Sequence, residues 1–145
     1  MRRNKNNERG STLVEFAIGA TVFLTVMFGV IEFGRALWVH NALSDAARRG
    51  ARYAVVHKES DSAAVKNVVV YGDPAGGSTP LVNNLALSNV NVTHSGFGLS
   101  GGTATVSISD YHFEFVLPIV STSISMPNYS TTLTAESAGL IPADL

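Results

Sequence analysis

The first third of the chain is dominated by one long apolar run. Residues 13–34 contain only two charged side chains, Glu15 and Glu32. As a helix this run would be roughly 33 Å long, which matches the ~30 Å hydrocarbon core of a bilayer. It is apolar on every face, unlike most buried helices of soluble proteins. A secretory signal peptide requires a small-x-small cleavage site after its apolar region, and none follows this run. The pattern therefore predicts a transmembrane span over about residues 13–34.

Helical spacing continues beyond the apolar run. No proline interrupts residues 11–57, and Ser11 or Thr12 is suited to cap the first turn. We expect one helix over residues 11–57, about 45 residues and roughly 68 Å long. Charged residues fall mostly on one side of its outer part: Asp45, Arg48, Arg49 and Arg52. Small or apolar residues recur every three or four positions on the other side, which we expect to pack closely: Leu43, Ala46, Ala47, Ala51 and Ala54.

Residues 58–145 alternate in steps of two, as strands do. Residues 61–71 predict a short helical turn that runs into a strand, and residues 72–80 predict a loop. Strands are expected near residues 89–94, from residue 103 onward, and over residues 130–136. Residues 95–102 would connect the first and second of these strands as a hairpin. In the third strand, Leu133 and Ala135 are expected to face inward. Apolar positions change parity near residues 109–110, which predicts a bulge. The fold class is α+β: a long transmembrane helix that continues outside the membrane, then a small antiparallel sheet of three or four strands packed on its outer half.

Charge is scarce and unevenly distributed. Charged residues make up 14% of the chain, all ten Lys and Arg lie within the first 66 residues, and cysteine is absent. The absence of cysteine excludes disulfides, thiolate metal sites and thiol nucleophiles. A second half without Lys or Arg cannot neutralise phosphates, so we expect no nucleic-acid binding. Basic residues lie directly before the span, which predicts that residues 1–10 stay in the cytoplasm and that residues 58–145 are exported.

The sequence contains no catalytic constellation. Nucleotide-binding, hydrolase and metalloprotease motifs are all missing. His94 and His112 fit polar sheet positions better than metal ligands, and Asp110 with Glu114 fits a solvated strand edge. We therefore expect no enzyme activity, no metal site and no cofactor.

Two carboxylates within the span require partners. Glu32 has Arg35 on the same helix face, so both are expected to extend into the outer interface. Glu15 has no cation at helical spacing within the span, which leaves Arg9 or a cation on another chain. Small residues also recur every four positions, in the pattern that lets membrane helices approach closely: Ala17, Thr21, Thr25 and Gly29.

The N-terminal residues resemble a class III, type IV pilin-like signal. A basic leader, residues 1–10, ends at Gly10, and Glu15 and Phe16 follow at the fifth and sixth positions. With the segments IEFGRAL and AARRGARYA, residues 10–56 resemble the TadE-like family, the minor pilin-like proteins or pseudopilins of tight-adherence (Flp, type IVc) pilus systems. The resemblance implies cleavage between Gly10 and Ser11. It also implies that Glu15 and Phe16 serve assembly, with Glu15 pairing with the new amine of a neighbouring subunit.

The expected function is that of a structural protein in pilus assembly. The resemblance implies a single-pass protein of the inner (cytoplasmic) membrane, with a cytoplasmic N-terminus and an exported C-terminal domain. Its expected partners are other pilin-like subunits, the Tad membrane platform, the prepilin peptidase and membrane lipid. Two alternatives stay open. One is a filament subunit that forms a homo-oligomer within an extracellular pilus, and the other is a membrane-anchored binding module.

Overall fold

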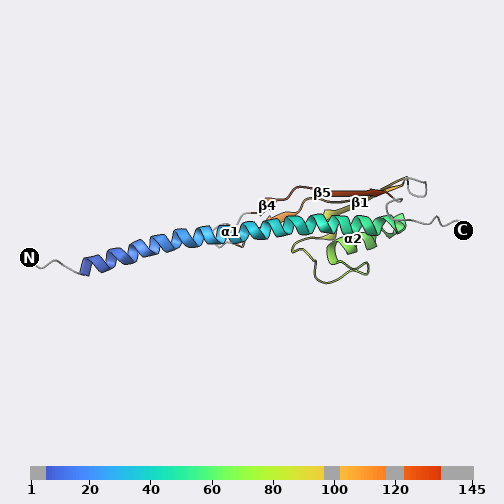
Figure 1. Ribbon diagram of the computed structural model, residues 1–145. Helices are drawn as coiled ribbons and strands as arrows, with labels where there is room; N and C mark the ends of the chain where they lie inside the picture. The colour runs from blue at the N-terminus through green and yellow to red at the C-terminus, as the bar shows by residue number, and fades with distance from the viewer. Residues whose placement is uncertain (1–5, 97–101, 117–122, 135–145) are drawn as a thin grey trace, which may run out of the picture.

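The computed structural model describes residues 6–96, 102–116 and 123–134, with side chains from Gly10 onward. One helix runs through the whole molecule, and every other element lies against its C-terminal half (Figure 1). The elements are α1 (Asn6–Val55), the 3-10 turn η1 (Glu59–Asp61), α2 (Ser62–Tyr71), the 3-10 turn η2 (Leu87–Asn89), β1 (Val90–Ser95), β2 (Thr103–Ile108), β3 (His112–Glu114), β4 (Ser123–Ser125) and β5 (Tyr129–Thr134). The predicted α+β class, a long apolar helix followed by a small antiparallel β region, is confirmed.

The strands form two antiparallel sheets. The larger has the order β1-β2-β5, and Val106 at its centre is paired with Val92 on one side and Thr131 on the other. The smaller is the β3–β4 ribbon, in which Phe113 is paired with Ile124. The larger sheet and α2 lie on opposite sides of the C-terminal half of α1 in Figure 1. That half of α1 is therefore enclosed by its own domain.

The core forms where α1, α2 and β2 meet. The small face of α1 is buried as the spacing predicts, and its members are at most 1% exposed: Leu43, Ala46, Ala47, Ala51 and Ala54. Gly50 lies on the same face, where an added Cβ would overlap Val69 of α2 and lie 3.2 Å from Cγ1 of Val106. The absence of a side chain at Gly50 lets the three elements approach one another.

Two expectations about the helices are wrong. The first helix begins at Asn6 and ends at Val55, so neither Ser11 nor Thr12 caps it. No proline lies near the expected start, so nothing there breaks the helix. Residues 62–71 are helical throughout and do not run into a strand. Valine favours strands, but here the spacing of Val65, Val68 and Val69 buries one helix face, and packing overrides the local preference.

The expected bulge is a complete break between two strands. β2 ends at Ile108, Asp110 adopts a left-handed backbone with φ 55°, and the chain resumes as β3. This turn restores the apolar face as anticipated, because Tyr111 and Phe113 are both buried. The larger sheet has three strands, as expected, and the turn starts a separate two-stranded ribbon, so the described residues contain five strands in all. β1, β2 and β5 follow the predicted alternation, with Leu133 packed against the core; Ala135 lies outside the described residues.

Candidate assembly helix and its attachment to the domain

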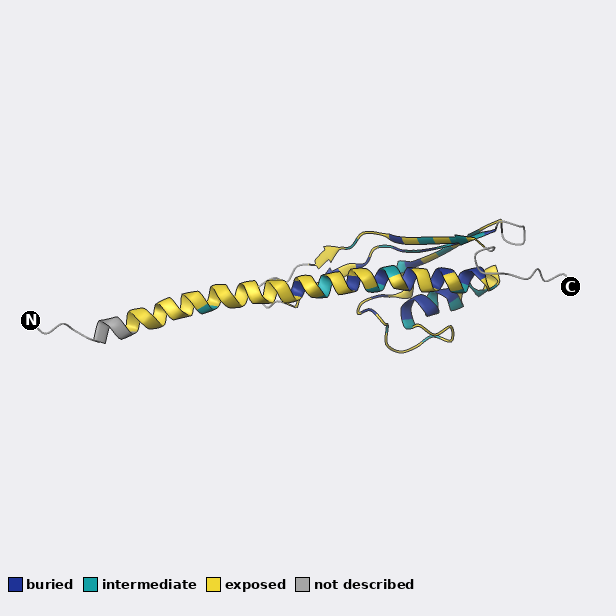
Figure 2. Ribbon diagram, viewed as in Figure 1, coloured by how far each residue is buried: buried dark blue, intermediate teal, exposed yellow. Residues whose placement is uncertain are grey.

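The N-terminal half of α1 projects from the domain, and no other described element packs on it (Figure 2). Every residue from 10 to 31 is exposed except Ala20, which is half-buried. This segment contains an 18-residue window that is long and apolar enough to cross a membrane, and none of that window is buried. A core helix of a soluble protein would be covered here. The projecting segment is therefore a candidate single-pass membrane anchor, continuous with the helix that fills the core.

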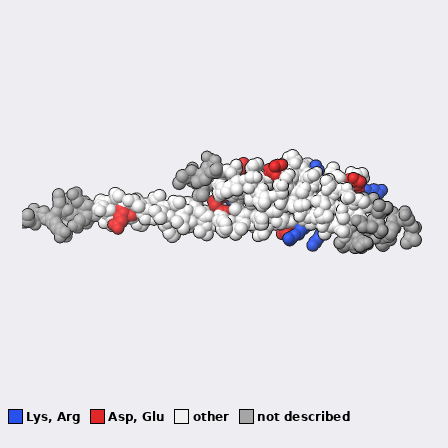
Figure 3. All heavy atoms as spheres, turned by 90° about the horizontal axis from the view of Figure 1, so that it is seen from above, with Lys and Arg blue, Asp and Glu red and all other residues white. Residues whose placement is uncertain are grey.

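The predicted processing and assembly residues lie on the first turns of this projecting segment. Gly10, Ser11, Glu15 and Phe16 are all exposed and helical. Figure 3 shows one acidic spot on the projecting half, where Glu15 is the only charged residue between positions 10 and 31. Within the described part of the chain, the Glu15 carboxylate has no hydrogen bond or ion pair. The cation expected to pair with Glu15 is therefore not supplied by the described residues.

The predicted ridge of small residues is exposed along its whole length. The hydroxyl of Thr21 donates to the carbonyl of Ala17, and that of Thr25 to the carbonyl of Thr21, both at 2.8 Å. These hydroxyls are satisfied within the helix, so the ridge presents a small and largely apolar surface. A Cβ added at Gly29 would meet no atom within 4 Å. The small size of these residues is therefore not required by the fold of the chain itself.

The predicted pair of Glu32 and Arg35 is present, but Glu32 is buried and does not extend into the outer interface as expected. Glu32 is only 7% exposed, the one buried charged residue among those described. Its carboxylate accepts hydrogen bonds from Nη2 and Nε of Arg35 at 2.8 and 3.2 Å. The same guanidinium donates to the backbone carbonyl of Glu114 and lies 4.3 Å from the ring centre of Phe113. Glu32 and Arg35 therefore fasten α1 to β3 at the point where the projecting segment ends.

Two phenols make further attachments near this junction. The hydroxyl of Tyr129 lies 2.8 Å from Nδ1 of His40, which joins β5 to α1. The hydroxyl of Tyr111 donates to the carbonyl of Asn83 at 2.7 Å. Burial raises the pKa of both phenols, so they stay protonated and can donate hydrogen bonds at neutral pH. The junction between helix and domain is held by several independent contacts.

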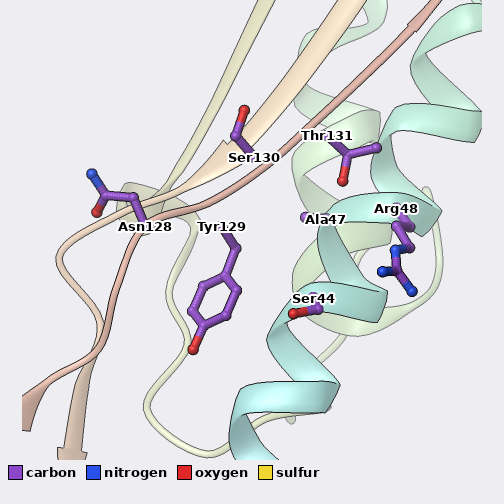
Figure 4. A pocket seen from close by; sticks show the side chains of 7 residues that line it. All are labelled: Ser44, Ala47, Arg48, Asn128, Tyr129, Ser130 and Thr131. Atoms are coloured by element: carbon purple, nitrogen blue, oxygen red, sulfur yellow. The ribbon is translucent and has the colours of Figure 1, made fainter.

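A polar groove of about 280 Å³ lies between α1 and β5 (Figure 4). It is lined by Ser44, Ala47 and Arg48 on the helix and by residues 128–131 on the strand side. Its one charged side chain, Arg48, is exposed and lies 3.4 Å from the carboxylate of Asp45. The described residues contain no group of three or more His, Cys, Asp or Glu that could hold a metal ion.

The fold and the projecting helix define an α+β protein with one candidate membrane anchor. Residues 10–52 match the family model described as TadE-like protein, which confirms the predicted resemblance over that segment. The match covers the projecting half of α1 and most of the half that fills the core. No curated protein and no solved structure matches the chain.

Proposed function

We propose that this protein is a membrane-inserted, pilin-like subunit that takes part in the assembly of a tight-adherence (Flp, type IVc) pilus. One observation carries the proposal: the C-terminal half of α1 holds the domain together while the N-terminal half stays exposed and apolar. A subunit built in this way can rest in a membrane as a monomer and later exchange lipid for the helices of other subunits. The TadE-like match over residues 10–52 supports a structural role in a pilus system.

Processing by a prepilin peptidase is the first proposed step. The leader stays on the cytoplasmic side, and the peptidase cuts between Gly10 and Ser11. In the uncut chain α1 continues across this bond, and a protease generally needs the backbone to leave the helix. Glycine favours that local opening, because it is about 1 kcal/mol less stable than alanine in a helix interior. Gly10 thus lacks a side chain that could hinder the peptidase, and it makes the helix locally less stable.

Assembly through Glu15 is the second proposed step. A carboxylate within an apolar span is stable only with a cationic or hydrogen-bonding partner. Cleavage creates a new α-amine at Ser11, at the same depth as the first turns of neighbouring helices. In a bundle of such helices the amine of one subunit would pair with Glu15 of the next, while the ridge from Ala17 to Gly29 lets the helices approach.

The variant Gly10→Leu tests the proposal in a strain from which the native gene has been deleted. Intact mass and N-terminal sequencing of membrane-extracted protein should find the native chain starting at Ser11. Gly10→Leu should stay full length and anchored, because leucine at the cut is too wide and strengthens the helix. Pili should be restored by the native chain and not by this variant.

Two results would contradict the proposal. Normal maturation of Gly10→Leu would show that the cut lies elsewhere. If the native chain is never cleaved and pili form without it, the protein is better explained as an anchored binding module.

A further inference from the structure

We propose that the β3–β4 ribbon is a second membrane contact, which enters the outer leaflet of the bilayer that α1 crosses. The inference rests on the membrane anchor proposed above and adds a surface of the exported domain. It starts from the place where Arg35 fastens the ribbon to α1. That place adjoins the end of the predicted span, because the span closes at about residue 34.

The depth of the ribbon follows from two contacts on α1. Val106 of β2 lies against Gly50, and the carbonyl of Glu114 in β3 lies against Arg35. Gly50 and Arg35 are fifteen residues apart, which is about 22 Å of helix. The eight residues from Val106 to Glu114 could span at most about 26 Å if fully extended, and the turn at Asp110 shortens that length. From β2 to β3 the chain therefore runs nearly parallel to α1, toward its N-terminal end. In Figure 1, β4 likewise lies nearer the projecting half of α1 than β1 and β5 do.

The chain beyond β3 reaches the level of the span. Val116 is two residues past Glu114, or about 6 Å farther in extended chain. Continued along the direction of β3, that distance would bring Val116 to about the level of residue 31 of α1, within the predicted span. A rigid domain held at Arg35 cannot keep this edge out of the bilayer unless α1 itself is lifted out.

The side chains of the ribbon suit the boundary between headgroups and acyl chains. Val116 is 73% exposed and Ile124 is 51% exposed, although both are apolar. Trp38, a side chain that favours this boundary, is exposed on α1 one turn above Arg35. The ribbon also carries four exposed polar side chains, which pair across its two strands as His112 with Ser125 and Glu114 with Ser123. Because Glu114 is acidic and no Lys or Arg lies on the ribbon, the contact depends on apolar insertion and not on anionic lipid.

The absence of native cysteine makes a direct depth measurement possible. Single variants Val116→Cys and Ile124→Cys are labelled with an environment-sensitive fluorophore. The full chain is then reconstituted in phosphatidylcholine vesicles that contain doxyl-labelled phosphatidylcholine as quencher. Val22→Cys, exposed in the middle of the span, reports insertion of α1. Thr93→Cys, exposed on β1 near the level of Gly50, reports the aqueous part of the domain.

The expected result is blue-shifted emission at positions 116 and 124, with lipid quenching closer to that of Val22→Cys than to that of Thr93→Cys. Replacing part of the lipid with phosphatidylglycerol should leave the quenching unchanged. Aqueous emission at 116 and 124, with Val22→Cys still quenched, would overturn the ribbon contact and leave the anchor intact. Protection from aqueous iodide without lipid quenching would assign the surface to another protein copy and overturn the lipid contact. Aqueous emission at Val22→Cys would overturn the anchor and the ribbon contact together.

Discussion

Gly50 and Gly29 both lie on α1, but they differ in what surrounds them. At Gly50 an added Cβ would overlap Val69 and press on Val106, so the domain core itself requires the absence of a side chain. At Gly29 an added Cβ would meet nothing within 4 Å, although the residue lies on the same helix. Any requirement for a small residue at Gly29 must therefore come from a second molecule.

The matched variants Gly50→Val and Gly29→Val separate these two roles. Gly50→Val should destabilise the domain by about 1–3 kcal/mol, because overpacking forces both neighbouring valines to move and their branched side chains are stiff. Gly29→Val should leave thermal unfolding of the domain in detergent unchanged but weaken crosslinking to other pilin-like subunits. Equal unfolding temperatures for the two variants would contradict the close packing at Gly50.

At the scale of elements, Arg35 holds α1 and β3 together. Arg35→Ala should lower the free energy of unfolding by on the order of 2–3 kcal/mol, because it leaves the buried Glu32 carboxylate and the Glu114 carbonyl without their donor. Arg48 supplies a matched control, since it also pairs three residues away, with Asp45, but on an exposed surface. Arg48→Ala should change stability little, and the double variant Glu32→Leu with Arg35→Leu should recover most of the loss.

Denaturation in detergent, followed by circular dichroism, measures these differences. If Arg35→Ala and Arg48→Ala unfold alike, the attachment of β3 does not depend on the guanidinium. If the double variant is as unstable as Arg35→Ala, the loss comes from the contacts of Arg35 with the Glu114 carbonyl and Phe113 and not from a stranded carboxylate.

Periodicity within one element could be predicted from the sequence, whereas contacts between distant elements could not. The buried face from Leu43 to Ala54 and the strand face of Ala104, Val106 and Ile108 follow from spacing alone. For residues 61–71 the sequence wrongly predicts a strand at the end of a helical turn, because valine favours strands locally; in the structure α2 is helical and packs on α1. Local spacing gives Arg35 a partner at Glu32 but cannot reveal Glu114, which lies 79 residues away. The exposure of Glu15 and of the small ridge depends on the tertiary structure, in which the domain leaves the N-terminal half of α1 uncovered. Local spacing alone does not predict it.

For the whole molecule, the proposed topology separates two faces of the membrane. Residues 1–10 should stay in the cytoplasm and the domain should lie outside, because four of the basic residues directly precede the span. Arg48, Arg49 and Arg52 oppose this orientation, but they lie beyond the Arg35 attachment, on the folded domain.

A reporter enzyme that is active only outside the cytoplasm, fused after Leu145, measures the orientation. We expect an active fusion. A stable but inactive fusion would place the domain in the cytoplasm and contradict the export on which pilus assembly depends. Fusion of the same reporter before Met1 supplies the opposite control and should be inactive.

The central claim is that the projecting half of α1 serves assembly and not anchoring alone, and Glu15 distinguishes the two roles. Removing a carboxylate from an apolar span improves a simple anchor, so Glu15→Leu should insert at least as well as the native chain. If Glu15 pairs with the amine of a neighbouring subunit, its loss leaves that amine unpaired in a poorly hydrated bundle. Breaking one partner of a buried pair costs on the order of 3–5 kcal/mol, a factor of several hundred or more in association.

The most direct measurement is therefore the count of pili from strains that carry Glu15→Leu or Glu15→Gln in place of the native residue, with the membrane content of each variant measured in parallel. Glu15→Gln keeps the shape and hydrogen bonding of the side chain and removes only its charge. We expect both variants to accumulate in the membrane and to be cleaved at Ser11. We also expect both to fail to form pili and to lose crosslinks to other pilin-like subunits. Normal pili from the Glu15→Leu strain would contradict the assembly role of Glu15, and would show that this carboxylate is only a tolerated charge at the end of a membrane anchor.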